Sequence, residues 1–145
     1  MDRVVSGDPL TLPSPRRGEG FVCVVAGVIE RDGLILIARR PAALHLGGLW
    51  EFPGGKQNAN ESPEAALARE IAEELGVRVT VGPLLERVDW SYPEKRVRLS
   101  FFRCAIEGEA RPLEGQELAW VRPADLRRYE FPPADATLLD RLSRG

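Results

Sequence analysis

The stretch "GGKQNANESPEAALAREIAEELGV" (residues 54–77) decides how the middle of this sequence folds. Ser62 suits a helix N-cap, because its hydroxyl can accept a hydrogen bond from an amide of the first turn, and Pro63 suits the first helical position. Gly76 suits the left-handed residue that follows a helix. The sequence therefore predicts a helix between Ser62 and Gly76, and this helix carries four of the five glutamates of the stretch.

Three of these glutamates crowd one side of the expected helix. At about 100° per residue, Glu70, Glu73 and Glu74 share an arc of about 100°. Arg69 lies beside Glu73 on the same surface. The arc borders the stripe that is expected to face the core, which consists of Leu67, Ala68, Ile71 and Leu75.

Two explanations of this crowding stay open on spacing alone. A charge run on a helix is commonly a solvated face with ion pairs four residues apart. Such faces usually mix signs, whereas Glu70 and Glu74 form a like-charge pair that costs about 0.2–0.5 kcal/mol unless a cation lies nearby. Clustered carboxylates at the edge of a core also suit a hard cation such as Mg²⁺, which takes oxygen ligands.

The order of residues in the stretch matches a longer pattern, G-x(5)-E-x(7)-R-E-U-x-E-E-x-G-U, in which U is a bulky aliphatic residue. The matching positions are Gly55, Glu61, Arg69, Glu70, Ile71, Glu73, Glu74, Gly76 and Val77. The chain thereby resembles the Nudix hydrolases. The resemblance implies a Nudix fold of the α+β class, with a mixed β-sheet sandwiched between helices. It also implies a hydrolase of nucleoside diphosphates linked to another group, with Mg²⁺ or Mn²⁺ as cofactor.

The resemblance assigns metal-binding roles within the stretch. Glu70, Glu73 and Glu74 are the expected metal ligands. Glu61 is expected to be an auxiliary ligand or to orient the others, and Gly54 is a further candidate metal position.

Catalytic roles follow from the same resemblance. The general base is either Glu70 or an acid from the sheet side, for which Glu114 is the candidate. Arg69 is expected to orient Glu70 and Glu73 through charged hydrogen bonds. Gly55 is expected to permit a tight backbone where the chain passes from strand to loop.

The rest of the chain agrees with an α+β fold without regular βαβ order. Short helices are expected at 123–129 and 133–142, and apolar strand-like runs at 21–30, 34–40, 77–81, 84–92, 95–106 and 118–121. With 145 residues the chain fits one domain, residues 21–145. An arm of residues 1–20, rich in proline and glycine, is expected to be extended or flexible.

Residues outside the stretch narrow the resemblance to one branch of the family. "RRPAALHLGGLWEFPGGK" (residues 39–56) and "FPPAD" (residues 131–135) resemble the MutT-type nucleoside triphosphate pyrophosphohydrolases. That branch converts a nucleoside triphosphate to the monophosphate and pyrophosphate, and 8-oxo-dGTP is its best-known substrate. The same likeness makes nucleotide-pool sanitising, and through it DNA repair, the expected role.

Three polar residues are candidates for nucleotide contact through this likeness. Arg40 matches an arginine that meets the substrate phosphates, although an exposed arginine at a strand end is the plain alternative. His45, the only histidine, matches a position near the nucleotide or is a structural loop residue. Lys56 is placed to meet phosphate or is simply exposed.

The base pocket has aromatic and acidic candidates. Phe52, Tyr92 and Phe131 are possible walls, with Trp50 a weaker one, although aromatic residues more often belong to a core. Asp135 stands where the best-known MutT pattern has asparagine. An ionised carboxylate only accepts hydrogen bonds, so it suits the N1–H and 2-amino group of guanine or the 4-amino group of cytosine. A helix N-cap is the alternative role of Asp135.

A smaller departure from the family lies at Asn60, where most relatives have glycine. Asparagine tolerates the left-handed conformation, so the loop is expected to form.

Composition excludes several classes of protein. The net charge of −2 argues against direct nucleic-acid binding. No apolar run reaches the ~18 residues of a membrane span, and no signal peptide opens the chain. We therefore expect a cytoplasmic protein without membrane contact, a monomer or homodimer, whose two cysteines are reduced core thiols.

Other functions compete with the nucleoside triphosphate hydrolase. Within the family, ADP-ribose, dinucleotides such as NADH and capped RNA ends are alternative substrates. A Nudix-fold recognition module without catalysis typically loses signature glutamates, and here the signature is complete. A structural or cation-buffering protein would have no need for Arg40 or for "FPPAD".

Overall fold

The computed structural model describes residues 20–41 and 48–144. Residues 1–19 of the expected arm therefore lie outside the described residues, and so does His45. Two α-helices and two 3₁₀-helices accompany the strands: α1 (Pro63–Leu75), α2 (Ala136–Arg144), η1 (Pro123–Arg128) and η2 (Pro133–Asp135). The strands are β1 (Phe21–Arg31), β2 (Leu34–Arg39), β3 (Trp50–Glu51), β4 (Gly54–Lys56), β5 (Arg78–Ser91), β6 (Arg96–Glu107) and β7 (Glu117–Val121).

The strands form a mixed sheet, as the sequence predicts. Its order is β3-β2-β1-β6-β5, with β4 paired to β1 and β7 paired to β2. β1 and β6 run parallel from the pair Phe21 and Arg96 to the pair Ile29 and Cys104, whereas every other pairing is antiparallel. Two strands distant in sequence therefore form the centre of the sheet.

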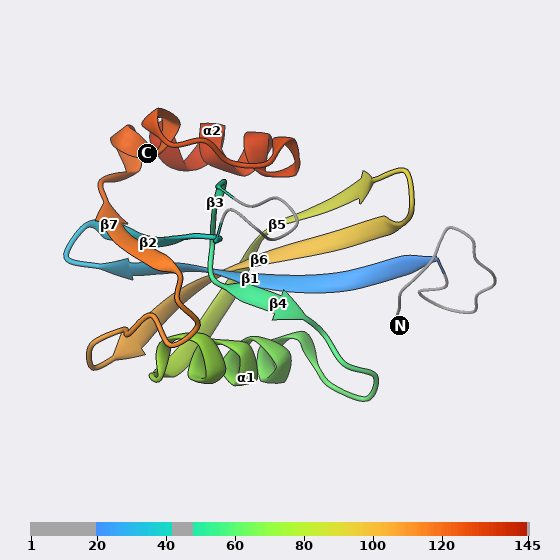
Figure 1. Cartoon of the computed structure of the whole chain (residues 1–145), viewed down its shortest axis with the longest axis horizontal. Helices are drawn as coiled ribbons and strands as arrows, with labels where there is room; N and C mark the ends of the chain where they lie inside the picture. The colour runs from blue at the N-terminus through green and yellow to red at the C-terminus, as the bar shows by residue number, and fades with distance from the viewer. Residues whose placement is uncertain (1–19, 42–47, 145) are drawn as a thin grey trace.

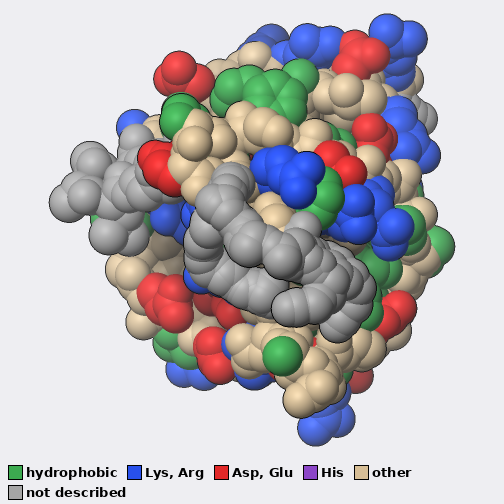
Figure 2. Space-filling model, turned by 90° about the vertical axis from the view of Figure 1, so that its right-hand side faces the viewer, with side chains coloured by type: hydrophobic (Ala, Val, Ile, Leu, Met, Phe, Trp, Pro, Cys, Tyr) green, Lys and Arg blue, Asp and Glu red, His purple; other side chains and the backbone are tan. Residues whose placement is uncertain are grey.

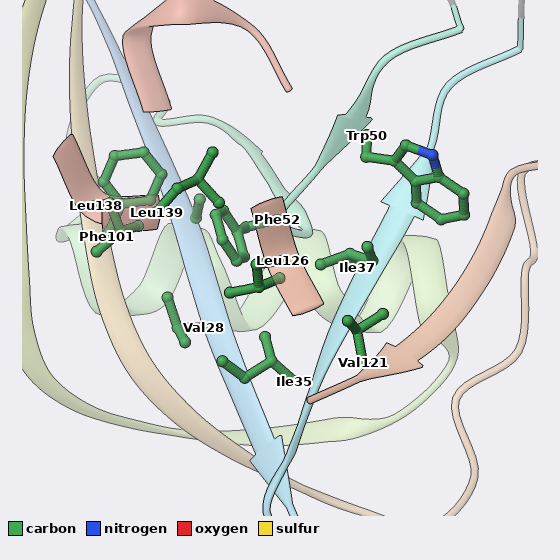
Figure 3. Close-up of a cluster of buried hydrophobic side chains, with 11 residues drawn as sticks. Val28, Ile35, Ile37, Trp50, Phe52, Phe101, Val121, Leu126, Leu138 and Leu139 are labelled. Atoms are coloured by element: carbon green, nitrogen blue, oxygen red, sulfur yellow. The ribbon is translucent and has the colours of Figure 1, made fainter. Parts of the chain in front are cut away.

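Helices cover both sides of this sheet, so the expected layered Nudix fold is confirmed. Figure 1 places α1 on one side of the strands and α2 on the other. Beneath α2 and η1 lies a core built around Phe101, Leu126 and Leu138 (Figure 3). Beneath α1 lies a second core that contains Leu67, Ile71 and Phe102.

Helix α1 has the caps that the sequence predicts. The Ala65 amide donates to the Ser62 hydroxyl at 3.0 Å, and Gly76 ends the helix with a φ of 68°. The expected buried stripe is wrong at one position, because Ala68 is exposed and Ala66 is fully buried. Which alanine is buried depends on how the helix rests on the sheet.

One strand differs from the expectation. The sequence predicts separate strands at 77–81 and 84–92, whereas β5 is continuous from Arg78 to Ser91. Its register against β6 shifts between Val81 and Leu84 and again before Glu86. Gly82 and Pro83, which suggest a break in the sequence, therefore form an irregularity within one continuous strand.

Three smaller expectations can be checked. Asn60 has a φ of 69°, so the left-handed conformation expected there is confirmed. Cys23 and Cys104 are free cysteines, and Cys104 is buried. None of the described helices has the length and apolar character needed to cross a membrane.

Candidate active site

A cavity of about 240 Å³ opens between β4, the β5–β6 hairpin and the segment before α2. Its floor consists of apolar side chains from the two central strands, β1 and β6. Its polar rim is built from residues that come from different elements: Arg40, Glu51, Lys56, Tyr92, Lys95 and Asp135. Gly54 and Gly55 form the wall nearest to α1.

Two glycines occupy β4 where other groups lie very close to its backbone, strand β1 at Gly54 and the Glu70 carboxyl group at Gly55. A Cβ on Gly54 would overlap the backbone of Val25 and Ala26, with which β4 pairs. A Cβ on Gly55 would lie within 2.7 Å of all three carboxyl atoms of Glu70. The carboxyl group of Glu70 is thus held directly against the backbone of the cavity wall.

Arg69 organises the acidic residues at this wall. Its Nε and Nη2 atoms donate to the two carboxylate oxygens of Glu61, at 2.7 and 3.0 Å, and Nη1 donates to Glu70 at 3.0 Å. Nη2 also donates to the carbonyl of Lys56 at 3.0 Å. Glu73 is only a distant partner at 3.7 Å. The expectation that Arg69 orients two glutamates therefore holds for Glu70, while Glu61 takes the place expected for Glu73.

The charge of Glu61 is fixed by these contacts. The Arg69 guanidinium, followed by the backbone amide of Asn58 at 2.9 Å, lowers the pKa of Glu61. The Glu61 partner in turn raises the pKa of Arg69. These contacts favour the ionised form of Glu61 and join the loop before α1 to the helix.

Glu74 has the opposite environment. Burial, followed by a hydrogen bond with Glu70 and the negative charge of that residue, raises the pKa of Glu74 to about 9. The charges of Glu51 and Glu114 act in the same direction. Glu74 and the three acidic side chains that act on it, Glu51, Glu70 and Glu114, therefore form an acidic group drawn from three parts of the chain. Glu73 lies outside this group, since 54% of its side chain is exposed.

The donor chemistry of this acidic group fits a hard divalent cation. Within residues 20–41 and 48–144, no three His, Cys, Asp or Glu side chains converge as a ready ligand cage. The Glu70 carboxyl is nevertheless pressed against Gly55, and Glu74 shares a hydrogen bond with it. Because mutual repulsion and burial both disfavour ionised Glu74, a divalent cation would favour its charged form.

Arg40 and Glu51 form an ion pair on the rim of the cavity. Arg40 Nε donates to Glu51 Oε1 at 2.9 Å. Burial raises the pKa of Glu51 even though Arg40 opposes this shift, and the charge of Glu114 adds to it. The charge of Glu51 acts both on Glu74 of α1 and on Asp135 at the other end of the cavity.

Asp135 occupies the far end of the cavity. Only 5% of the residue is exposed, and burial, followed by the charge of Glu51, raises the pKa of Asp135 to about 7. Asp135 is the last residue of η2 and directly precedes α2, so a cap of α2 stays its alternative role. Its carboxyl can therefore both donate and accept hydrogen bonds near neutral pH.

Two of the aromatic candidates line the cavity, and the other two pack behind it or in the core. Tyr92 and Phe52 line the cavity, although Phe52 is only 4% exposed. Phe131 is not a lining residue but packs on Phe52, with ring centroids 5.2 Å apart. Trp50 is buried against Tyr129 and belongs to the core.

The structure thus places six of the fourteen expected site residues around one cavity, and none of the glutamates of α1 is among its lining residues. Arg40, Phe52, Lys56, Tyr92, Asp135 and Gly54 line it. Sequence reasoning missed Glu51 and Lys95. Glu51 stands inside the quoted "WEFPGGK", so its place in the family-like stretch was a usable signal, whereas Lys95 is recognisable only once the β5–β6 hairpin is known.

The surface beside the hairpin carries mixed charge. Figure 2 shows basic and acidic side chains interspersed on this face.

Comparisons with known proteins agree with the site. The model of the NUDIX domain matches residues 24–141. The CTP pyrophosphohydrolase of Escherichia coli K12 is 41% identical over 118 residues, which cover 81% of this chain and 87% of the relative. The 8-oxo-dGTP diphosphatase of Haemophilus influenzae is 41% identical over 126 residues, which cover 84% and 91%.

Solved structures agree as well. The solution structure of the E. coli ORF135 protein has a TM-score of 0.77 and 38% identity, covering 88% of this chain and 91% of that one. A structure from work on MutT of Aliivibrio salmonicida and Vibrio cholerae has a TM-score of 0.71 and 36% identity, covering 86% and 98%.

The chain belongs to the NUDIX domain family. It is a Nudix hydrolase, and hydrolases of this family generally use divalent metal ions.

Proposed function

We propose that this protein hydrolyses a nucleoside triphosphate to the monophosphate and pyrophosphate, with Mg²⁺ or Mn²⁺, and acts on 8-oxo-dGTP or cytosine deoxynucleotides. The observation that carries the proposal is the cavity that extends from the Gly55 wall, against which the carboxyl group of Glu70 lies, to Asp135. One end offers carboxylates for a cation, and the other offers a buried carboxyl group for a base. A nucleotide has its phosphates and its base arranged in the same order.

The residues that would hold the cation are Glu70 and Glu74, with Glu73 reaching in from its exposed position and Gly54 contributing through its backbone. Glu61 supports the set indirectly, because both of its oxygens are engaged by Arg69. When bound, the cation neutralises phosphate charge and lowers the pKa of the attacking water. The carboxylates alone would repel a polyanionic substrate.

The phosphate chain is expected to meet the basic residues of the rim. Arg40 and Lys56 line the cavity on the side of β4, and Lys95 faces it from the β5–β6 hairpin. Guanidinium and ammonium groups are the usual phosphate partners in proteins. The phosphate oxygens would compete with Glu51 for Arg40, to which Glu51 is now bonded at 2.9 Å.

The base is expected to lie against Tyr92 and Phe52 with its polar edge at Asp135. In its ionised form Asp135 accepts from the N1–H and 2-amino group of an oxidised guanine or from the 4-amino group of cytosine. In its protonated form it also donates, to guanine O6 or to cytosine N3. This dual chemistry accommodates the substrates in the names of both relatives, CTP and 8-oxo-dGTP.

A general base is needed to take the proton of the attacking water as the bond between the α- and β-phosphoryl groups breaks. Glu70 and Glu114 are the two candidates. Glu114 is exposed and its charge acts on both Glu74 and Glu51. We favour Glu114 here, because Arg69 and the Gly55 backbone already fix the carboxyl group of Glu70.

Pyrophosphate release tests this proposal. We expect 8-oxo-dGTP, dCTP or 5-methyl-dCTP to be cleaved faster than dATP and dTTP, and only when Mg²⁺ or Mn²⁺ is present. Glu74→Gln is expected to remain folded and to lose at least about 100-fold in kcat. Glu64→Gln, which removes a first-turn carboxylate outside the acidic group, is the matched control. Near wild-type turnover by Glu74→Gln in Mg²⁺ would contradict the assignment.

We also propose a cytoplasmic location, which is where free nucleotides are hydrolysed, and a role in nucleotide-pool sanitising and thereby DNA repair. The protein is expected to act as a monomer or homodimer on a free nucleotide, without binding nucleic acid directly.

A further inference from the structure

The segment between β6 and β7, residues 108–116, is docked on the C-terminal end of α1. The Arg111 amide donates to the Leu75 carbonyl at 2.9 Å, and the Leu113 amide donates to the Glu74 carbonyl at 3.1 Å. Carbonyls at a helix C-terminus have no partner within the helix, so this segment satisfies two of them. The segment is thereby fixed against the turn that carries Glu74.

Gln116 adds a side-chain link to the same turn. Its Nε2 donates to the Glu74 carbonyl at 3.1 Å, and its Oε1 accepts the amide of Glu114 at 2.9 Å. A primary amide donates and accepts at once, which a carboxylate or an aliphatic side chain of similar length cannot do. One side chain therefore joins the backbones of two acidic residues that lie on different elements.

The position of Glu114 depends on this link more than on packing. Glu114 is exposed, and it lies in a tight turn in which the Gly115 amide donates to the Pro112 carbonyl at 3.3 Å. Gly115 has a φ of 75°, a conformation that favours glycine. The turn is therefore well defined internally, and its placement relative to α1 comes from the bonds of Leu113 and Gln116.

We infer that Gln116 is a positioning residue that holds Glu114 in place beside the acidic end of α1. The geometric part of this inference stands on hydrogen bonds alone, while its catalytic consequence rests on the proposed function, in which Glu114 is the favoured base. Gln116 is 42 residues from Glu74 and outside the Nudix signature, so the signature does not assign it a role.

The geometric part is tested in metal-free protein by amide hydrogen exchange. Gln116→Met has a side chain of similar length and removes both hydrogen bonds. We expect exchange of the Glu114 amide to become at least about tenfold faster. Glu109→Gln, which changes an exposed charge in the same segment, is the matched control and should leave that rate unchanged. If Gln116→Met does not fold, Gln116→Ala replaces it, because it also removes both hydrogen bonds.

The catalytic part is tested by kinetics in Mg²⁺. We expect Gln116→Met to lower kcat about tenfold with KM changed by less than about twofold. In a Glu114→Gln background the same change should lower kcat by less than about twofold, because the group that Gln116 positions is already lost. Unchanged exchange of the Glu114 amide, unchanged kcat, or additive effects of the two substitutions would each overturn the inference.

These results are separable from the proposed function. A wild-type protein that releases no pyrophosphate from any nucleotide would reject the proposed function, and the exchange measurement would still decide whether Gln116 holds Glu114.

Discussion

The pKa of Asp135 is raised because of where the backbone places this residue. The residue ends η2, lines the cavity and is almost fully buried, so its charged form loses the solvation of water. Glu51 and Tyr92 face the same cavity, and the negative charge of Glu51 adds to the effect. The sequence identifies Asp135 as the residue that departs from the MutT pattern, but its burial becomes visible only in the folded chain.

Replacing Asp135 by asparagine is expected to change the choice of base. The amide of the new side chain would donate and accept at every pH, whereas the carboxyl group of Asp135 changes from donor and acceptor to acceptor alone as it ionises. We therefore expect Asp135→Asn to reorder kcat/KM among 8-oxo-dGTP, dCTP and 5-methyl-dCTP by about tenfold, which corresponds to about one hydrogen bond. An unaltered ranking would show that Asp135 does not read the base.

The same residue is expected to make stability depend on pH. The pKa of Asp135 is about 7 in the folded protein and about 3.9 in the unfolded chain, so the folded state binds the proton more tightly. Its contribution to the free energy of unfolding is therefore complete below about pH 4 and is lost as the pH rises through 7.

Urea unfolding checks this expectation. Between pH 5 and pH 8 the wild-type protein should lose about 2 kcal/mol more than Asp135→Asn, because the variant has no proton to lose at this position. Parallel pH profiles of the two proteins would contradict the assignment of the titration to Asp135.

At the scale of elements, the carboxyl group of Glu70 on α1 fills the space that a side chain on Gly55 of β4 would occupy. An alanine there would overlap the carboxyl group of Glu70 without needing a left-handed backbone. We expect Gly55→Ala to displace Glu70, to weaken Mn²⁺ binding and to lower kcat by at least about tenfold. Binding is measurable by the paramagnetic resonance of free Mn²⁺, with thermal unfolding as the check on folding. Wild-type Mn²⁺ affinity in this variant would disprove that the contact matters.

The elements themselves were largely predictable where local chemistry decides them. Ser62 and Gly76 mark the ends of α1 through hydrogen bonding and backbone conformation, which are properties of the residues concerned. The continuity of β5 was not predictable, because a Gly–Pro step usually marks the end of a strand. Here β5 continues past Gly82 and Pro83 because it pairs with β6 on both sides of this step. Likewise the burial of Ala66 instead of Ala68 depends on how α1 rests on the sheet.

The candidate site was likewise predictable where its residues are close in sequence, and not where tertiary contacts bring them together. Residues of the signature are close in sequence, so their helix brings them together. Lys95 and Gln116 reach the site only through the pairing of β5 with β6 and the docking of residues 108–116. Contacts of this kind depend on the tertiary fold and leave no periodic pattern in the chain.

At the scale of the whole molecule, residues 21–145 are proposed to fold as one domain. Among the described residues, those that build both cores and the cavity all follow Gly20, and the NUDIX domain match begins at residue 24. A protein lacking residues 1–20 is therefore expected to keep its melting temperature within about 3 °C and its kcat within about twofold. A larger loss in circular dichroism melting or in turnover would assign the arm a structural role.

The cavity also has a consequence for how this scaffold can diversify. In the proposed function the metal ligands belong to the contiguous residues 54–77, while Tyr92 and Asp135 reach the opposite wall from the β5–β6 hairpin and from the segment before α2. Because the apolar floor separates the two walls, substitutions of Tyr92 and Asp135 are expected to change which nucleotide is accepted without disturbing bond cleavage. A lineage that carries this scaffold can therefore acquire new substrates by mutation at a few peripheral positions and keep its chemistry intact.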